Sequence, residues 1–423
     1  MILNKNTYQN LYGKNVSISS VDKRINHLIE EFDKEFKINK KDSILLFSSP
    51  GRAEIGGNHT DHQKGFAVAA ALNLDILAVV RRRDDMIFNI YSDGFNKVSV
   101  DLSSLDKKEE EIGCAPSLVR GVAKAMSING LKIGGADVIS QSTVVRASGL
   151  SSSAAFEVLI ANIISYLYND DCLSPSSAAK AGWWAENNYY GKPCGMMDQN
   201  AVAHGGIILF DASCGANGKA TKIPTKFVGD DFSFIITNTN SEHSDITDAY
   251  AAIVDEMKAV SSYFGKSVLS EVSKNDFVSS VKEIRKAVKN DRAILRAIHF
   301  YSENERAKAM HQSLIKNNTK EFLKLINESG DSSFEMLQNI YVDRMPNEQS
   351  VSIAIGLSKM FLEGKKGAVR IQGGGFGGCI QAYIPKADKK EYIALMDSVF
   401  GKGSARELCV REEKAGFITE LKI

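Results

Sequence analysis

The sequence has few cysteines, and their spacing excludes two kinds of protein. Six occur among 423 residues, at Cys114, Cys172, Cys194, Cys214, Cys379 and Cys409. Secreted disulfide scaffolds need closely spaced cysteines, and structural zinc sites commonly use a C-x-x-C pair with a His-x-x-x-His pair; neither pattern occurs in this sequence. We therefore expect reduced thiols and no structural zinc.

The sequence also lacks a long apolar run and an excess of charge of either sign. No stretch approaches the roughly 18 apolar residues of a membrane-spanning helix, and residues 1–10 contain no apolar signal segment. Lys plus Arg number 52 and Asp plus Glu number 51, so the formal net charge is only +1. This balance does not favour binding to nucleic acid or to a membrane. We expect a cytoplasmic monomer that binds small molecules and has no specific protein partner.

A third absence is a Walker-type phosphate loop. Gly265-Lys266-Ser267 resembles the end of such a loop, but Val260 stands where the G-x-x-x-x-G-K-[ST] pattern needs glycine. A P-loop nucleotide hydrolase is therefore disfavoured. The length alone predicts two or three domains with a well-buried core.

The hydrophobic pattern predicts a mixture of short strands and longer helices. The predicted strands are Ile44–Phe47, Ile76–Val80, Ile87–Tyr91, Gly206–Phe210, Phe232–Asn238, Ala368–Ile371 and Gly378–Ile384. The predicted helices are Ser117–Met126, Ser152–Tyr168, Ser177–Tyr190, a run from about Thr247 to Asn327, Glu348–Leu362 and Lys389–Phe400. Cys214–Lys226 has the composition of a domain junction, which divides the chain into domains 1–220 and 221–423. This order of elements predicts an α+β protein in two lobes.

One stretch, residues 147–157, predicts an anion-binding site. It reads A-S-G-L-S-S-S-A-A-F-E, so a glycine turn and three serines precede an apolar helix pattern. The first N–H groups of a helix have no intrahelical partner, and the helix dipole is positive at that end. A phosphate over Ser151 to Ser153 would satisfy both. The alternative is that Ser151 is only the N-cap of a core helix.

Two polar segments carry groups suited to binding and activating a hydroxylated ligand. Gly51–His62 contains an arginine, two imidazoles and a carboxylate in a glycine-kinked loop, which suits a polyol. An ordinary surface loop is the alternative. Glu186–Gln199 delivers Asp198, a carboxylate able to orient and deprotonate a hydroxyl. Taken alone, Asp198 would be a helix N-cap and Glu186 a solvated helix residue.

Two further segments are informative only in combination with these. Arg370–Cys379 holds five glycines in six positions, so its backbone can closely approach a ligand or another loop. A tight hairpin is the alternative. Asn238–Ser244 is a polar strand end, and Tyr250 follows it on the first turn of a helix. Tyr250 alone would be a core or boundary aromatic.

Together and in this order, the segments resemble the GHMP kinase superfamily, most closely its galactokinase branch, over about residues 40–385. Galactokinases have a sugar loop G-R-V-N-L-I-G-E-H-T-D-Y, a nucleotide loop G-x-G-L-S-S-S-A, a catalytic turn C-G-I-M-D-Q and a C-terminal G-G-G-F-G-G. The matching stretches are Gly51–His62, Ala147–Ala154, Cys194–Gln199 and Gly373–Gly378. The resemblance implies an N-terminal lobe of the ribosomal S5 domain-2-like type, a ferredoxin-like C-terminal lobe and an active site in the cleft. It also implies transfer of the γ-phosphate of ATP to the anomeric hydroxyl of galactose, giving galactose 1-phosphate.

Carried over by position, the resemblance implies a role for each matching residue. Asp198 resembles the catalytic base and Arg52 the arginine that stabilises the transition state, and this guanidinium would lower the pKa of Asp198. Ser153 and Glu186 fall on Mg²⁺ ligand positions, a reasonable pair for a metal that keeps most of its waters. The implied sugar-binding residues are Asn58, His59, Thr60, Asp61, Gly195 and Tyr250. The implied ATP-binding residues are Ala147, Ser148, Gly149, Leu150, Ser151, Ser152 and Ser153.

The sequence departs from the galactokinase pattern most clearly in the sugar loop. Glu54 replaces the usual Asn, His62 the usual Tyr, and Asn58 the glutamate that accepts from the sugar 6-hydroxyl. A glutamate about 4 Å from a C6 carboxylate would cost roughly 4 kcal/mol at an effective dielectric near 20, a penalty that Asn58 avoids. Galacturonokinases likewise lack this glutamate and have an Asp-His-Gln triplet, similar to Asp61-His62-Gln63. Galactose is the expected substrate, and galacturonate or another galactose-like sugar is the alternative.

An alternative of another class is a non-catalytic protein that responds to sugar and ATP, because some galactokinase relatives act as inducers. Loss of residues from the G-L-S-S-S-A stretch would favour it. Gly149–Ala155 is complete and Asp198 is present, so the enzyme is favoured.

Overall fold

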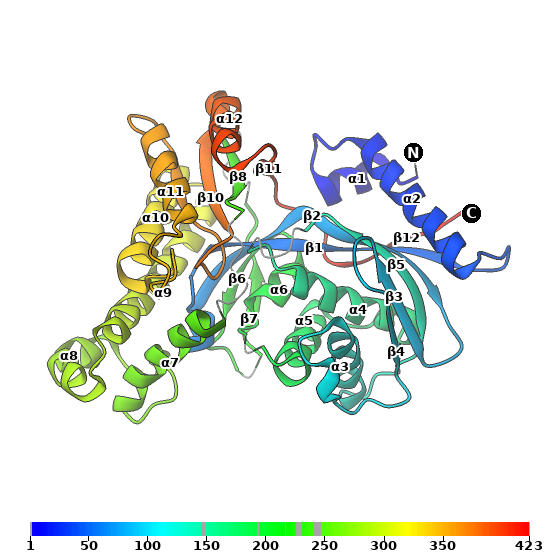
Figure 1. Ribbon diagram of the computed structural model, residues 1–423, viewed down its shortest axis with the longest axis horizontal. Coiled ribbons are helices and arrows are strands. Elements are labelled where there is room, and N and C mark those ends of the chain that lie inside the picture. Colours follow the sequence, from blue (N-terminus) through cyan, green and yellow to red (C-terminus); the bar gives the residue numbers. More distant parts are fainter. Residues whose placement is uncertain are drawn as a thin grey trace.

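The chain folds into two lobes, each built around its own sheet (Figure 1). The structure, a computed structural model, describes residues 2–144, 149–192, 194–215, 217–225, 231–240 and 247–422. Helices and strands are mixed in both lobes, so the predicted two-lobed α+β fold is confirmed. In the part of the chain that is described, no helix is both long enough and apolar enough to span a membrane.

The N-terminal lobe contains an eight-stranded sheet. Its strands are β1 (Ile44–Gly56), β2 (Phe66–Arg82), β3 (Ile87–Ser92), β4 (Val98–Asp101), β5 (Ala136–Ser142), β6 (Ile207–Asp211), β7 (Lys219–Lys222) and β12 (Gly416–Leu421). The main order is β12-β1-β2-β5-β3-β4, while β6 pairs with β2 and β7. Only β3 and β5 pair in parallel among these strands.

Helices cover both faces of this sheet, so its central strands are apolar on both sides. One face carries α1 (Lys5–Tyr12) and α2 (Ile18–Phe36), and the other carries α3 (Ala115–Ile128), α4 (Ser152–Tyr168), α5 (Pro175–Ala185) and α6 (Met197–His204) (Figure 1). Ile44 and Leu46 pack in the cluster of α2, while Leu45 and Phe47 pack in that of α4. This alternation follows from the two-residue period of a strand.

The C-terminal lobe contains a four-stranded antiparallel sheet in the order β11-β8-β10-β9. These strands are β8 (Phe232–Asn238), β9 (Ala368–Ile371), β10 (Cys379–Pro385) and β11 (Ala405–Leu408). The helices of this lobe are α7 (Thr247–Tyr263), α8 (Lys274–Val288), α9 (Asp291–Ile315), α10 (Thr319–Ser332), α11 (Ser350–Phe361) and α12 (Lys389–Phe400). Short helical turns are η1 (Asp61–Gln63), η2 (Glu109–Glu111), η3 (Glu186–Tyr190), η4 (Leu269–Glu271), η5 (Ser333–Leu337) and η6 (Lys386–Asp388).

Several predicted elements have the expected bounds and others differ, two of them for identifiable reasons. The bounds of α4, β8, β9 and α12 are confirmed. β1 continues nine residues beyond the predicted end at Phe47, because Pro50 is accommodated where the register with β2 shifts. The helix predicted to reach Tyr190 changes after Ala185 into the π-turn η3. The division into domains 1–220 and 221–423 stays a prediction. β12, near the C-terminus, pairs with β1 and so belongs to the sheet of the N-terminal lobe.

The C-terminal half of β1 and the N-terminal half of β2 are buried between the lobes. Ala53 and Ile55 of β1 share a core with Phe234 of β8, Met310 of α9 and Tyr383 of β10. The loop that follows β1 therefore begins at the junction of the two lobes.

A buried carboxylate ties the N-terminal helices and the C-terminal segment to the sheet. Asp75 accepts hydrogen bonds from Tyr12 (2.8 Å) and Ser48 (2.5 Å), pairs with Arg24 at 2.6 Å and lies 3.7 Å from Arg411. Burial alone would raise the pKa of Asp75, but the two arginines and Ser48 reverse the effect and lower it. This carboxylate is therefore ionised at neutral pH.

Asp75→Asn should destabilise the protein strongly, because it leaves the buried Arg411 guanidinium and the half-buried Arg24 guanidinium without their carboxylate. We expect the free energy of unfolding at pH 7 to fall by about 3–5 kcal/mol, measured by chemical denaturation. Because the pKa of Asp75 is lower in the folded than in the unfolded state, its charge stabilises the protein at pH values above the unfolded-state pKa. The difference in stability between the wild type and Asp75→Asn should therefore narrow as the pH falls below about 4.

Asp93→Asn is the control, because Asp93 pairs with His27 at the surface. It should change stability by no more than about 1 kcal/mol. Equal effects of the two substitutions would contradict the role of Asp75.

Candidate active site

Arg52 lies at the centre of the predicted site because a bulge in β1 directs it there. The register of β1 against β2 shifts between Pro50 and Arg52. The Arg52 backbone N–H donates to Leu150 O at 3.0 Å, an approach that the missing side chain of Gly51 allows. The Arg52 guanidinium donates to both carboxylate oxygens of Asp198, at 2.7 Å from Nε to Oδ1, and to the carbonyl of Gly149.

Asp198 lies in the first turn of α6 and is held as an ionised carboxylate. Met196 occupies the N-cap position of this helix, so the interpretation of Asp198 as an N-cap is wrong. Ser151 Oγ donates to Asp198 Oδ2 at 2.7 Å. Burial alone would raise the pKa of Asp198, but Arg52, Ser151 and Lys192 lower it below the ordinary value. The predicted effect of the guanidinium on this pKa is confirmed.

Ser151 precedes α4 in a left-handed backbone conformation, with φ 58°. Its side chain makes no cap hydrogen bond to the helix, so the interpretation of Ser151 as a simple side-chain N-cap is wrong. A positive φ is unfavourable for serine and is kept where surrounding contacts impose it, as the bond to Asp198 does. The first turn of α4, with Ser152 and Ser153, contains no acidic residue, which leaves its N–H groups suited to an anion. Ala147 and Ser148, also predicted to bind ATP, lie outside the described residues.

The glycine-rich loop, residues 373–378, closes one side of this site by backbone contacts. Gly373 O accepts from Asn58 Nδ2 at 2.8 Å, Gly374 O lies 2.8 Å from His59 Nε2, and Gly375 O accepts from Tyr250 Oη at 2.9 Å. A Cβ atom on Gly149 would lie 2.9 Å from Gln372 O. The loop joins the antiparallel strands β9 and β10, so it is a hairpin and also a close backbone contact with the other predicted loops.

The sugar loop contains both internal contacts and side chains directed to other segments. Thr60 Oγ1 donates to Gly57 O and Phe66 O, at 2.8 and 2.7 Å, so it supports the loop itself. Burial lowers the pKa of His59 to about 4, so its imidazole is neutral. The ring of His59 lies 6.3 Å from that of Tyr250.

Asp61 of this loop lies against the turn that precedes Asp198. A Cβ atom on residue 195 would overlap the Asp61 carboxylate, so only glycine fits there. Burial, together with the nearby charge of Asp198, raises the pKa of Asp61 to about 6. The structure thus brings the predicted residues Asp61, Gly195 and Asp198 together.

Asn58 is fully buried, and the protein itself uses its hydrogen-bonding capacity. Its Nδ2 donates to Glu54 Oε1 at 2.7 Å in addition to Gly373 O, and its Oδ1 accepts from Asn339 Nδ2 at 2.8 Å and Ser333 Oγ at 3.4 Å. This differs from the expected amide that faces a sugar, because four bonds within the described residues occupy both donors and both lone pairs.

Glu54 supplies a carboxylate directly behind Asn58. Its Oε1 also pairs with Arg370 at 3.0 Å, and Arg370 donates to Ile55 O at 2.8 Å. Burial raises the pKa of Glu54 to about 7, against the lowering effect of Arg370. The corner of the site around residue 58 therefore contains a buried carboxylate–guanidinium pair.

The predicted metal ligands lie on neighbouring elements. Glu186 begins η3 and is buried, so its interpretation as a solvated helix residue is wrong. Its carboxylate lies 3.3 Å from Lys192 Nζ and accepts from Cys194 Sγ at 3.0 Å and Gln199 Nε2 at 2.9 Å. Within the described residues, no cluster of three or more His, Cys, Asp or Glu side chains could hold a metal ion. A single carboxylate and the Ser153 hydroxyl nevertheless fit Mg²⁺, which keeps several waters and shares nucleotide phosphates.

Sequence reasoning missed several residues that support the site. Asn339 joins the sugar loop to the glycine-rich loop, since its Nδ2 also donates to Gly374 O at 3.0 Å. Glu303 accepts from Gly57 N at 2.9 Å, and His299 Nε2 lies 2.9 Å from Asn58 O. These residues carry no motif, because they come from helices and turns remote in sequence. Glu54 was visible as a departure from the galactokinase pattern.

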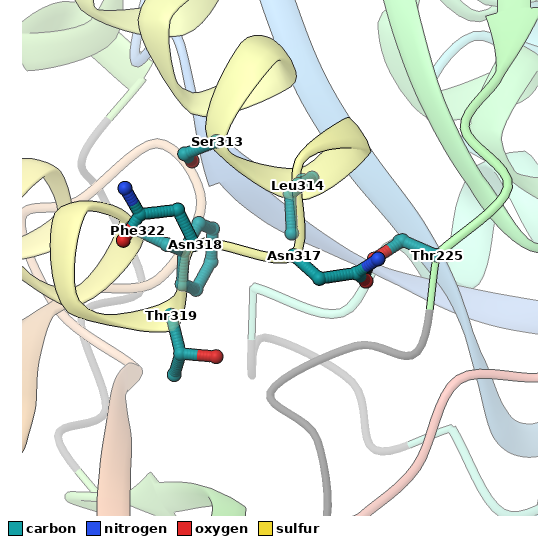
Figure 2. Close-up of a pocket in the computed structure, with 7 residues that line it drawn as sticks. All are labelled: Thr225, Ser313, Leu314, Asn317, Asn318, Thr319 and Phe322. Carbon is teal, nitrogen blue, oxygen red and sulfur yellow. Dashed lines mark hydrogen bonds between the residues drawn. The ribbon is translucent and has the colours of Figure 1, made fainter.

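Two pockets lie away from Arg52 and Asp198. Figure 2 shows the smaller one, at the turn between α9 and α10, where Asn317 lies beside Thr225 and Asn318 and Phe322 complete the lining. Its volume is about 10 Å³, room for one water and not for a sugar, and Asn318 there caps α10 by accepting from Glu321 N at 3.1 Å. The other, about 530 Å³, is lined by residues of α7, α9 and η5 and by Phe376. The candidate site is therefore identified by its hydrogen-bonded groups and not by either of these pockets.

Two family models match the chain in the N-terminal lobe. The galactokinase galactose-binding signature matches residues 30–82, and the N-terminal domain of GHMP kinases matches residues 117–206. A galactokinase of Clostridium tetani (strain Massachusetts / E88) is 34% identical over 374 residues, which cover 86% of this chain and 90% of that protein. The chain belongs to the galactokinase family.

Other members of the galactokinase family and their structural relatives agree with this assignment. A galactokinase of Glaesserella parasuis serovar 5 (strain SH0165) is 30% identical over 360 residues, covering 84% of this chain and 88% of that protein. The crystal structure of Lactococcus lactis galactokinase complexed with galactose covers 93% of this chain and 99% of its own, with a TM-score of 0.77 and 22% identity. A mevalonate kinase structure matches with a TM-score of 0.60 and 16% identity, covering 87% of this chain and 100% of its own. These structures show that the galactokinase fold is shared.

Gly375→Ala should disturb the glycine-rich loop of this galactokinase family member more than a comparable glycine elsewhere. Gly375 has φ +90°, and a Cβ there would overlap the carbonyl of Asn339. Gly364 has φ +70° but nothing within 4 Å of a Cβ, so Gly364→Ala measures the backbone effect alone. We expect the free energy of unfolding, measured by urea denaturation, to fall by about 1–2 kcal/mol for Gly364→Ala. For Gly375→Ala it should fall by about 1–3 kcal/mol more than that. Equal losses would contradict the close contact.

Proposed function

We propose that this galactokinase family member is a sugar 1-kinase that transfers the γ-phosphate of ATP to the anomeric hydroxyl of galactose. The observation that carries the proposal is the position of Asp198. An ionised carboxylate contacts the Arg52 guanidinium and Ser151 beside the N-terminus of α4, and the sugar loop lies next to it. Phosphoryl transfer needs a group that accepts the proton of the attacking hydroxyl, a cation and a phosphate site, all close together. Asp198, Arg52 and the N-terminus of α4 would supply these three parts.

Asp198 would orient the anomeric hydroxyl and accept its proton as the phosphorus–oxygen bond forms. Because Arg52 keeps the pKa of Asp198 low, orientation matters more than the basicity of the carboxylate. Arg52 would stabilise the negative charge that develops on the transferred phosphoryl group, and the N–H groups that open α4 would hold the other phosphate oxygens.

Ser153 and Glu186 would hold a Mg²⁺ ion, which neutralises phosphate charge when bound. The resident contacts of Glu186 are with Lys192, Cys194 and Gln199, so its carboxylate is already directed and partly charge-compensated. ATP is the phosphate donor that membership of a kinase family implies, while the metal, a cytoplasmic location and a monomeric state stay predictions.

Sugar recognition would fall to His59, Asp61 and Tyr250. Asp61 accepts hydrogen bonds once ionised, neutral His59 offers an imidazole, and Tyr250 offers a hydroxyl. Gly195 allows Asp61 to approach the catalytic turn, which would bring the sugar hydroxyls close to Asp198. The galactokinases of Clostridium tetani and Glaesserella parasuis support galactose as the sugar.

The surroundings of Asn58 do not favour galacturonate. Asn58 is neutral, but its amide contacts the Glu54 carboxylate at 2.7 Å, and Arg370 balances that carboxylate at 3.0 Å. The carboxyl group that galactokinases carry at residue 58 thus has a counterpart at Glu54, directly behind Asn58 and paired with Arg370. The described partners of the Asn58 side chain include no cation for a C6 carboxylate. The replacement of glutamate by Asn58 therefore gives no electrostatic preference for galacturonate.

An assay of ATP consumption with galactose, galacturonate and N-acetylgalactosamine tests the proposal. We expect galactose to give a kcat/KM at least about tenfold above that of the other two sugars. Equal or faster turnover of galacturonate would move the function to the alternative substrate. Sugar-dependent ATP binding without turnover of any sugar would contradict the enzyme and support a binding protein.

Asp198→Asn should abolish turnover, because the amide keeps the shape but cannot accept the proton, and it should also lower stability because the buried Arg52 guanidinium loses its carboxylate partner. We expect a fall in kcat of more than about 100-fold, measured with galactose and ATP. Asp211→Asn, at the end of β6 and outside the site, is the control and should keep the rate. A variant of Asp198 that retained more than about a hundredth of the activity would remove the assigned role.

A further inference from the structure

Two buried carboxylates meet at one side-chain amide beside the catalytic turn. Gln199 Nε2 donates to Glu157 Oε2 at 3.0 Å and to Glu186 Oε2 at 2.9 Å. All three side chains are buried, and Glu157 and Gln199 are fully so. Gln199 directly follows Asp198, and Glu186 is the proposed metal ligand, so this contact joins the two.

The helices bring these groups together through a close approach at Gly182. Glu157 follows Ser153 by four residues and lies on the same face of α4. A Cβ on Gly182 of α5 would lie 2.9 Å from Glu157 Cβ and 3.3 Å from Gln199 Cγ. The absence of a side chain at residue 182 therefore allows α4 and α6 to share the Gln199 amide.

The chemistry of the contact fixes the orientation of the Gln199 amide. Gln199 Nε2 lies within hydrogen-bond distance of both carboxyl groups, and a carboxyl group has an oxygen that accepts from an amide N–H in either protonation state, so the NH₂ group faces Glu157 and Glu186. As a result, Gln199 Oε1 and Glu157 Oε1 are buried without a hydrogen-bond partner among the described residues. Such unpaired groups cost stability, and a folded protein keeps them where another requirement imposes them.

We infer that Gln199 is a positioning residue for Glu186 and that Glu157 holds Gln199 in place, so that the Glu186 carboxylate is directed for metal binding. The inference rests on the proposed function, since it assumes that Glu186 is a Mg²⁺ ligand. Groups that orient a metal-binding carboxylate act through hydrogen bonds of this kind, and their loss weakens metal affinity about 10–100-fold.

Three substitutions separate positioning from packing. Gln199→Met keeps the volume and removes both hydrogen bonds, and Glu157→Met removes the acceptor that fixes Gln199. Glu157→Gln restores an acceptor oxygen of the same reach. We expect Gln199→Met to raise the KM for Mg²⁺ by about 10-fold or more, Glu157→Met to raise it less, and Glu157→Gln to stay near the wild type. The KM for galactose should change by less than about twofold in all three.

Binding of Mn²⁺ in the presence of a non-hydrolysable ATP analogue, followed by electron paramagnetic resonance, gives a readout independent of turnover. The dissociation constant of Mn²⁺ should rise in the same order as the KM for Mg²⁺. Asn200→Leu is the matched control, because Asn200 is a buried amide on the same helix whose described hydrogen bond is to Met196 O and not to a carboxyl group. It should leave metal binding unchanged even if it lowers stability.

Equal metal affinity in wild type and Gln199→Met would overturn the inference, as would a common shift of the KM values for Mg²⁺, ATP and galactose. A Glu157→Gln variant as impaired as Glu157→Met would also contradict it. Absence of sugar-dependent turnover in the wild type would instead count against the proposed function, and the Mn²⁺ measurement would still decide the role of Gln199.

Discussion

The ion pair between Arg52 and Asp198 is the interaction around which the site is arranged. Arg52 comes from a bulged strand, Asp198 from the first turn of α6, and Ser151 and Gly149 from the loop that opens α4. Three separate stretches of chain therefore converge on two opposite charges. Because the guanidinium and the hydroxyl both favour the charged carboxylate, Asp198 stays ionised although it is only partly exposed.

A second constraint is that backbone, not side chain, closes the site from the C-terminal lobe. Three successive carbonyls of the glycine-rich loop accept from Asn58, His59 and Tyr250, which belong to the sugar loop and α7. Glycine is required where Gly149 and Gly375 approach neighbouring carbonyls. The Glu54–Arg370 pair then adds a buried bridge between the lobes without changing the net charge of this corner.

Sequence patterns predicted several elements with a strong apolar pattern, but they missed the amphipathic helix α2 and the contacts between distant segments. The bounds of α4 and β8 follow from uninterrupted apolar patterns. β1 was predicted too short because proline usually ends a strand, and a bulge removes that limit. Two separate motifs supplied Arg52 and Asp198, which the structure brings into contact, while their catalytic roles stay predictions. They did not show that Asn58 is saturated by Glu54 and Asn339, because that depends on segments nearly 300 residues apart.

The identity of the phosphorylated product tests the central assignment most directly. Phosphorus-31 magnetic resonance of the product formed from galactose and ATP distinguishes phosphate on the anomeric carbon from phosphate elsewhere on the sugar. Coupling of the phosphorus to the anomeric proton is the result expected from a kinase whose Asp198 orients the anomeric hydroxyl. Phosphate on C6, or release of inorganic phosphate without a sugar phosphate, would contradict it.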